Sequence, residues 1–165
     1  MNQIILASHG GLAAGAKDTL EMVLGDVSNV HVVSLARDDK EPITNKVEAM
    51  IATFNADDTV YVLTDMLGSS VNNNMVELSK NGTVFTVISG FNIPLALTLA
   101  LSPAPVKGAE LAALINEART GLTNPSAPVE VAPAAPVKKA KAARHNAGPA
   151  KIVLARLDYR LLHGQ

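Results

Sequence analysis

The stretch IILASHGGLAAG, residues 4–15, joins an apolar run to a helical pattern through one histidine and two glycines. The run at residues 3–7 has aliphatic and β-branched side chains without polar alternation, which is typical of a strand buried on both faces. Residues 12–24 repeat apolar side chains at helical spacing, and Gly25 follows them as a helix terminator. His9 is therefore predicted to lie in the loop between this strand and the helix that follows.

The strand-and-helix pattern repeats along most of the chain. We expect further strands at residues 30–35, 59–64 and 83–89, and further helices at residues 42–54, 71–80, 92–102 and 108–120. Because the strands lack an alternation of apolar and polar side chains, both of their faces must be buried. The sequence thus predicts an α/β fold in which helices cover both faces of a parallel sheet.

Three loops should meet at one edge of this sheet, since the carboxyl ends of parallel strands share an edge, where ligands gather in open α/β folds. His9 follows the first strand, residues 65–70 follow the third, and residues 90–94 follow the fourth. We expect the functional site among these loops.

His9 is the first candidate. The small residues around it leave the ring open, and Gly10 and Gly11 expose amides at a helix start, which favours an anion there. Histidine can carry a phosphoryl group on one ring nitrogen while an acceptor holds the other. A loop histidine that only hydrogen-bonds the backbone would have the same local sequence, so spacing alone leaves both interpretations open.

The stretch LTDMLGSS, residues 63–70, favours the functional interpretation. Asp65 is placed to hold one ring nitrogen of His9, while Gly68, Ser69 and Ser70 open a helix with amides and hydroxyls that suit phosphate oxygens. An ordinary strand-to-helix turn with a serine cap is the alternative. Neither loop has a Walker A or GxGxxG pattern, so a nucleotide-binding fold is not supported.

Other polar residues carry weaker signals. Asn92 and Pro94, in SGFNIPLAL, either shape a rim around the site or simply start a helix. His31 lies inside the apolar run of the second strand and is expected to be structural. The sequence calls for no metal and no cofactor.

Composition excludes several classes of protein. The chain of 165 residues has no cysteine, which rules out disulfides, a thiol nucleophile and cysteine metal sites. The first residues lack the basic and apolar regions of a signal peptide, and the longest apolar segments are too short to span a bilayer. We therefore expect a soluble, cytoplasmic protein.

Charge is distributed unevenly along the chain. Residues 1–123 carry 7 Lys and Arg against 13 Asp and Glu, whereas residues 124–165 carry 7 against 2. An acidic body argues against nucleic acid as the main partner.

The sequence changes character near residue 124. We expect a folded domain at residues 1–124 and a disordered linker at residues 125–149, which is rich in Ala, Pro and Lys. We interpret residues 150–165 as the first strand and loop of a second domain that is cut off. Their sequence is AKIVLARLDYRLLHGQ. Arg160 precedes His163 there, and arginines neutralise charge beside a phosphate-carrying histidine.

Taken together, these stretches resemble the mannose-family enzyme IIA domain of the bacterial sugar phosphotransferase system. The matching segments are ASHGGLAAG, LTDMLGSSVNN and ISGFNIPLALTLA, and the linker resembles the hinge of fused IIAB proteins. The final segment is similar to the opening of the IIB domain, with its R-L-[LI]-H-G-Q motif. The resemblance implies a doubly wound, mostly parallel sheet and a homodimer that exchanges a fifth, antiparallel strand, for which residues 128–131 are our candidate.

The resemblance also implies a phosphoryl relay. His9 matches the histidine that takes a phosphoryl group from the phosphocarrier protein, on the ring nitrogen farther from the backbone. Asp65 matches the carboxylate on the other nitrogen, and Ser70 the hydroxyl near the phosphate. The expected phosphate-binding loop residues are Gly10, Gly68, Ser69 and Asn92.

The next step of the implied relay involves the second domain. His163, with Arg160, matches the IIB histidine that passes the phosphoryl group to sugar entering through the membrane subunits IIC and IID, with which the protein would associate peripherally. Met66 and Tyr159 depart from the residues common in the family. We expect the second domain to be truncated, so that His163 would lack its folded site. A phosphotransfer subunit of dihydroxyacetone kinase, a regulatory domain of the same fold and a flavodoxin-like binding module remain as alternatives.

Overall fold

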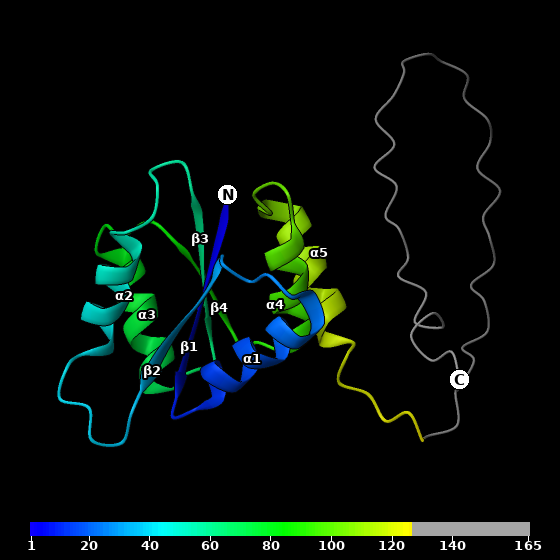
Figure 1. Ribbon diagram of the computed structural model, residues 1–165, viewed down its shortest axis with the longest axis horizontal. Helices are drawn as coiled ribbons and strands as arrows, with labels where there is room; N and C mark the ends of the chain where they lie inside the picture. Colours follow the sequence, from blue (N-terminus) through cyan, green and yellow to red (C-terminus); the bar gives the residue numbers. More distant parts are fainter. Residues whose placement is uncertain (127–165) are drawn as a thin grey trace, which may run out of the picture. The chain divides into compact units, whose positions relative to one another are not determined.

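A four-stranded parallel sheet in the order β2-β1-β3-β4 forms the centre of residues 1–126, the part of the chain that this computed structural model describes (Figure 1). The strands are β1 (Asn2–His9), β2 (Val30–Leu35), β3 (Thr59–Thr64) and β4 (Thr86–Ser89). Every pairing between them is parallel. The predicted α/β fold with a parallel sheet is therefore confirmed.

Within residues 1–126, five helices cover the two faces of the sheet. They are α1 (Leu12–Leu24), α2 (Ile43–Ile51), α3 (Ser70–Lys80), α4 (Ile93–Leu101) and α5 (Gly108–Arg119). Helices α1, α4 and α5 lie on one side of the sheet, and α2 and α3 lie on the other (Figure 1). This doubly wound arrangement gives the sheet two separate apolar layers.

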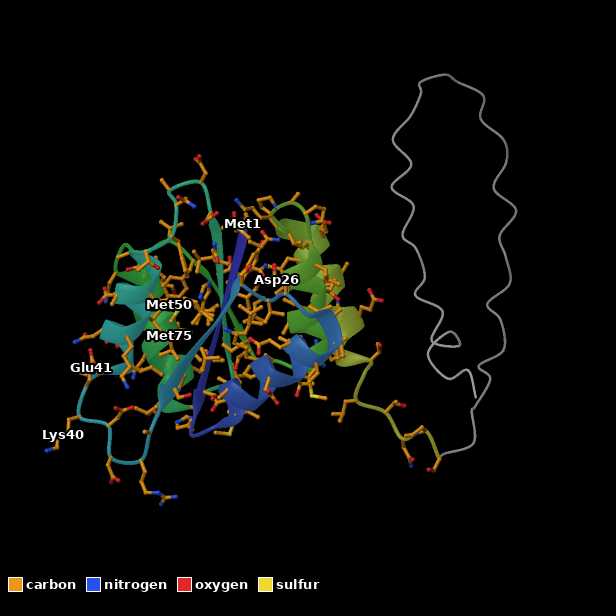
Figure 2. All side chains as sticks on the ribbon, in the orientation of Figure 1. Met1, Asp26, Lys40, Glu41, Met50 and Met75 are labelled. Carbon is orange, nitrogen blue, oxygen red and sulfur yellow. The ribbon has the colours of Figure 1, made fainter. Side chains whose placement is uncertain are left out.

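Strand β1 shows why its sequence has no polar alternation. Ile4 and Leu6 pack into the layer under α1, α4 and α5, whereas Ile5 and Ala7 pack into the layer under α2 and α3. All four are fully buried. In Figure 2 Met75, which belongs to this second layer, lies among the side chains between the sheet and its two covering helices.

Four elements are shorter than the sequence predicted: α4 by one residue at each end, α5 by one residue at its end, and β4 and α2 by more. The fourth strand covers only Thr86–Ser89, because these are the residues that pair with the end of β3, while Gly82 turns the chain at φ +103° and Val84 is exposed. Helix α2 ends before residue 54, because its last turn tightens into i to i−3 hydrogen bonds, from Thr53 to Met50 and from Phe54 to Ile51.

Tyr61 ties the sheet to the segment before α5. Its buried hydroxyl donates a hydrogen bond to the carbonyl of Val106 (2.9 Å) and accepts one from the amide of the same residue (2.8 Å). The substitution Tyr61→Phe leaves both backbone groups without these bonds, and we expect it to lower the free energy of unfolding by about 1–3 kcal/mol. Denaturant unfolding measures this loss, and an unchanged midpoint would contradict it.

None of the helices within residues 1–126 has the length and apolar character needed to cross a bilayer. The predicted linker from residue 127 onward, the strand at residues 128–131 and the second-domain segment at residues 150–165 lie outside the described residues.

Candidate active site

His9 is the last residue of β1 and is held between that strand and α1. Gly10 adopts φ +55° and donates its amide to the carbonyl of Leu35 in β2 (3.0 Å). Ser8 accepts a hydrogen bond from the amide of Ala13 (2.8 Å), so the strand itself caps the first turn of α1. The side chain of His9 remains 38% exposed.

Asp65 follows β3, the strand that pairs with β1 on the side away from β2. Helix α1 leads from β1 toward β2, and α3 leads from β3 toward β4, so the two connections diverge at this point of the sheet edge. Such a topological switch point is where open α/β sheets form a crevice. The structure brings His9 and Asp65 together there, as the shared edge predicts.

Two hydrogen bonds join His9 to Asp65. The backbone amide of His9 donates to Oδ2 of Asp65 (2.9 Å), and ring Nδ1 lies 2.7 Å from the same oxygen. The other carboxylate oxygen, Oδ1, accepts from the amide of Met66 (2.8 Å) and from the hydroxyl of Ser69 (3.3 Å). Asp65 therefore receives four hydrogen bonds, and every partner can act as the donor.

These donors control the ionisation of Asp65. Burial by itself raises the pKa of this carboxyl, whose side chain is only 4% exposed, but the bonds from His9 and Met66 outweigh burial. The net effect lowers the pKa of Asp65 below its ordinary value of 3.8. At neutral pH it is a carboxylate, which accepts hydrogen bonds and cannot donate them.

An ionised Asp65 fixes the tautomer of His9. Because the carboxylate only accepts, Nδ1 carries the ring proton and Nε2 keeps its lone pair. Ser70 Oγ lies 3.0 Å from Nε2 and donates its hydroxyl proton to that lone pair. The ring thus presents an unprotonated nitrogen, next to a hydroxyl, on its exposed side.

Helix α3 begins beside this nitrogen. Gly68 adopts φ +77°, which lets the loop turn sharply into Ser69, and Ser69 caps the helix by accepting the amide of Asn72 (3.2 Å). Helix geometry gives the amides of Ser70 and Val71 no acceptor inside the helix. The start of α3 therefore favours negative charge close to His9 Nε2.

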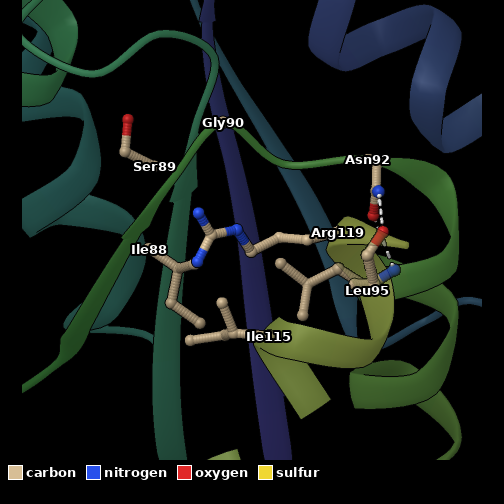
Figure 3. A pocket seen from close by; sticks show the side chains of 8 residues that line it. Ile88, Ser89, Gly90, Asn92, Leu95, Ile115 and Arg119 are labelled. Atoms are coloured by element: carbon tan, nitrogen blue, oxygen red, sulfur yellow. Dashed lines mark hydrogen bonds between the residues drawn. The ribbon is translucent and has the colours of Figure 1, made fainter. Parts of the chain in front are cut away.

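Asn92 has a structural position in the third loop. Its Oδ1 caps α4 by accepting the amide of Leu95 (3.0 Å), and its Nδ2 donates to the carbonyl of Ala118 in α5 (2.7 Å), as Figure 3 shows. Asn92 also lines a hollow of about 340 Å³, which the side chains of Ile88 and Arg119 line as well (Figure 3). The arrangement favours the helix-start interpretation of this loop over direct phosphate contact by Asn92.

His31 is structural, in keeping with its place in β2. Its Nε2 lies 2.9 Å from Gln3 Oε1, and its ring lies against Phe54 with centroids 4.8 Å apart. Among residues 1–126, no three His, Cys, Asp or Glu side chains come together in a way that could hold a metal ion.

The lowered pKa of Asp65 predicts a pH dependence of stability. The unfolded chain has the ordinary pKa of 3.8, so the native carboxylate contributes stability that is fully present above that pH. This contribution is lost as pH falls through the lower native value. We measure the free energy of unfolding by denaturant at pH 2–6. In Asp65→Asn we expect this part of the decrease at low pH to be absent. A pH profile identical to that of the wild type would contradict the lowered pKa.

Comparison with known proteins gives a consistent result. The family model EIIA-man, described as "PTS system fructose IIA component", matches residues 3–118. The chain is 34% identical over 173 residues to the mannose-specific EIIAB component of Escherichia coli strain K12, covering 98% of this chain and 54% of that protein. It is 26% identical over 101 residues to the sorbose-specific EIIA component of Lacticaseibacillus casei, covering 61% and 72%.

A solved structure supports the same relationship. The IIA protein associated with the fucose utilization operon of Streptococcus pneumoniae superposes with a TM-score of 0.64 at 29% identity, covering 74% of this chain and 92% of that one. The chain spans about half the length of the curated mannose-specific relatives that it matches.

Proposed function

The chain belongs to the EIIA-man family of phosphotransferase system components, and we propose on this basis that His9 carries a phosphoryl group in a sugar phosphotransferase relay. The observation that carries the proposal is the orientation of the His9 ring. Nδ1 is bound to the Asp65 carboxylate, and Nε2 faces Ser70 and the exposed side. A histidine held in this way has one defined nucleophilic atom.

In the proposed step, the Nε2 lone pair attacks the phosphorus of a phosphohistidine on the donor protein. The new P–Nε2 bond forms as the donor P–N bond breaks, and the electron pair of that bond returns to the donor ring. Phosphorylated His9 keeps its Nδ1 proton and is cationic at the ring, a charge that the Asp65 carboxylate stabilises. Transfer to an acceptor histidine reverses these events.

Ser70 and the start of α3 would bind the transferred group. Once Nε2 is bonded to phosphorus, the Ser70 hydroxyl loses its acceptor and is free to donate to a phosphoryl oxygen. The amides of Ser70 and Val71 and the dipole of α3 add positive potential on the same side. Positioning and electrostatic stabilisation of this kind are what phosphoryl transfer requires of a protein.

The proposed partners follow the family. The donor is the histidine-phosphorylated phosphocarrier protein, and the acceptor is a IIB histidine, to which His163 with Arg160 corresponds in this sequence. Sugar would then be phosphorylated as it enters through IIC and IID. We further propose that the protein acts as a homodimer in the cytoplasm, in peripheral association with these membrane subunits.

Incubation with the phosphorylated carrier, followed by intact-mass measurement, tests the function. We expect the mass to rise by one phosphoryl group and to fall again when a separately purified IIB domain is added. No mass gain would contradict phosphoryl acceptance. A gain that IIB does not discharge would instead indicate a regulatory domain that is phosphorylated without passing the group on.

A further inference from the structure

Asn72 is a polar side chain in an apolar position. It lies in the first turn of α3 with only 3% of its surface exposed, beside the fully buried Val71 and Met75. Burying a carboxamide costs free energy unless its polar atoms find partners. The polar atoms of a buried asparagine at this point of the helix must therefore have hydrogen-bond partners.

Both ends of the Asn72 carboxamide bind the loop that carries the site. Oδ1 accepts the amide of Gly68 (3.0 Å), and Nδ2 donates to the hydroxyl of Thr64, the last residue of β3 (3.0 Å). These two contacts bracket residues 65–67. The carboxamide thus fixes the point where the loop leaves the strand and the point where it turns into the helix.

The bracketed loop supplies the groups that orient His9. Asp65 opens it, and Ser69 follows Gly68, with its hydroxyl 3.3 Å from Asp65 Oδ1. Gly68 sits at φ +77°, a backbone conformation that glycine adopts but does not impose. The bond from its amide to Asn72 selects one orientation for this peptide.

We propose that Asn72 is a positioning residue for phosphoryl transfer by His9, acting through Asp65, Ser69 and Ser70; this role rests on the proposed function. No hydrogen bond joins Asn72 to His9 among the contacts of the described residues. Its effect is to hold the Asp65 carboxylate within hydrogen-bond distance of Nδ1 and the Ser70 hydroxyl within hydrogen-bond distance of Nε2. A misplacement of about 1 Å in such groups can cost about 100-fold in rate.

Two asparagines of the same helix, Asn72 and Asn74, provide a matched experiment. Asn72→Ala removes both contacts, whereas Asn74→Ala makes the same change in the same helix at a side chain for which the described residues show no hydrogen bond. Asn72→Asp is the conservative variant: its carboxylate can accept both the Gly68 amide and the Thr64 hydroxyl, which rotates to donate. At the third helical residue a carboxylate is also favoured by the helix dipole.

The first readout is the rate of phosphoryl acceptance from the phosphorylated carrier. For folded Asn72→Ala we expect kcat to fall about 10- to 100-fold with KM for the carrier unchanged, since the docking surface is intact. Asn74→Ala should match the wild type, and Asn72→Asp should recover most of the rate. Equal losses in Asn72→Ala and Asn74→Ala, or a change in KM alone, would overturn the proposal.

The second readout is the tautomer of His9, from the ¹⁵N shifts of its ring in the unphosphorylated protein. The wild type should show one tautomer, with the proton on Nδ1, and Asn72→Ala should show a mixture of both. A single tautomer together with the wild-type rate would overturn the proposal. Because this signal needs no phosphoryl donor, it separates failure of Asn72 positioning from failure of the proposed function, in which the wild type itself would accept no phosphate.

Should Asn72→Ala not fold, Thr64→Val reaches the same contacts from strand β3. It removes the hydroxyl that accepts from Asn72 and leaves α3 unaltered, with a side chain of nearly the same shape. We expect a smaller fall in kcat with the same mixed tautomer. The wild-type rate and a single tautomer in this variant would contradict the role of Asn72.

Discussion

Replacing His9 by asparagine should abolish phosphoryl acceptance while leaving the fold intact. The asparagine amide takes the place of ring Nδ1 and can still donate to Asp65, but nothing in the variant replaces Nε2, the atom that forms the bond to phosphorus. Intact-mass measurement after incubation with the phosphorylated carrier should therefore show no gain. The circular dichroism spectrum and the unfolding midpoint should stay close to those of the wild type.

His163→Asn is the matched control, because it makes the same change at the other candidate phosphohistidine of the sequence. We expect this variant to gain phosphate from the carrier as the wild type does. Undiminished labelling of His9→Asn would show that another residue accepts the phosphoryl group, and loss of labelling in His163→Asn alone would reverse the proposed order of the relay.

Asp65→Asn should lower the transfer rate by about 10²- to 10⁴-fold. Positioned proton-transfer groups contribute about this range, and loss of the carboxylate that orients a catalytic histidine costs about 10⁴-fold. All four partners of Asp65 can donate hydrogen bonds, and an asparagine offers only one acceptor oxygen. If Nδ2 of the asparagine faces His9, its N–H groups meet the backbone N–H of His9, which is also a donor, and ring Nδ1. Nδ1 must then accept, which favours the tautomer with the proton on Nε2. If Nδ2 faces the other way, it meets the N–H of Met66, and that hydrogen bond is lost.

The same ¹⁵N measurement of the His9 ring checks the cause of this loss. We expect Asp65→Asn to move proton population from Nδ1 to Nε2, with a loss of rate to match. Asp57→Asn is the control, since Asp57 is exposed in the loop before β3 and undergoes the same change of chemistry. A wild-type rate in Asp65→Asn would mean that the carboxylate does not orient the ring.

The shared edge of His9 and Asp65 could be predicted because it depends only on features that the local sequence shows. Apolar runs without alternation indicate a parallel sheet, and a parallel sheet places the residues after its strands at one edge. The sequence could not show that β1 and β3 are neighbours, which the crossovers decide. The 2.7 Å contact between the His9 ring and Asp65 depends on that order.

Asn72 and Asn92 were harder to interpret because their roles depend on distant backbone. Asn72 stands in a run of three asparagines with no spacing that distinguishes it, and only its burial against Thr64 and Gly68 does so. Asn92 was expected near phosphate, but the carbonyl of Ala118, 26 residues along the chain, binds its amide. A polar residue beside a predicted site can therefore serve the scaffold, and only tertiary contacts tell the two uses apart.

The position of the phosphoryl group on the ring tests the central claim most directly. Nuclear magnetic resonance of the ¹⁵N-labelled, phosphorylated protein shows which ring nitrogen of which histidine is coupled to phosphorus. The geometry of Asp65 and Ser70 predicts coupling to Nε2 of His9, with the proton retained on Nδ1. Coupling to Nδ1 of His9, or phosphate on any other residue within residues 1–126, would contradict it.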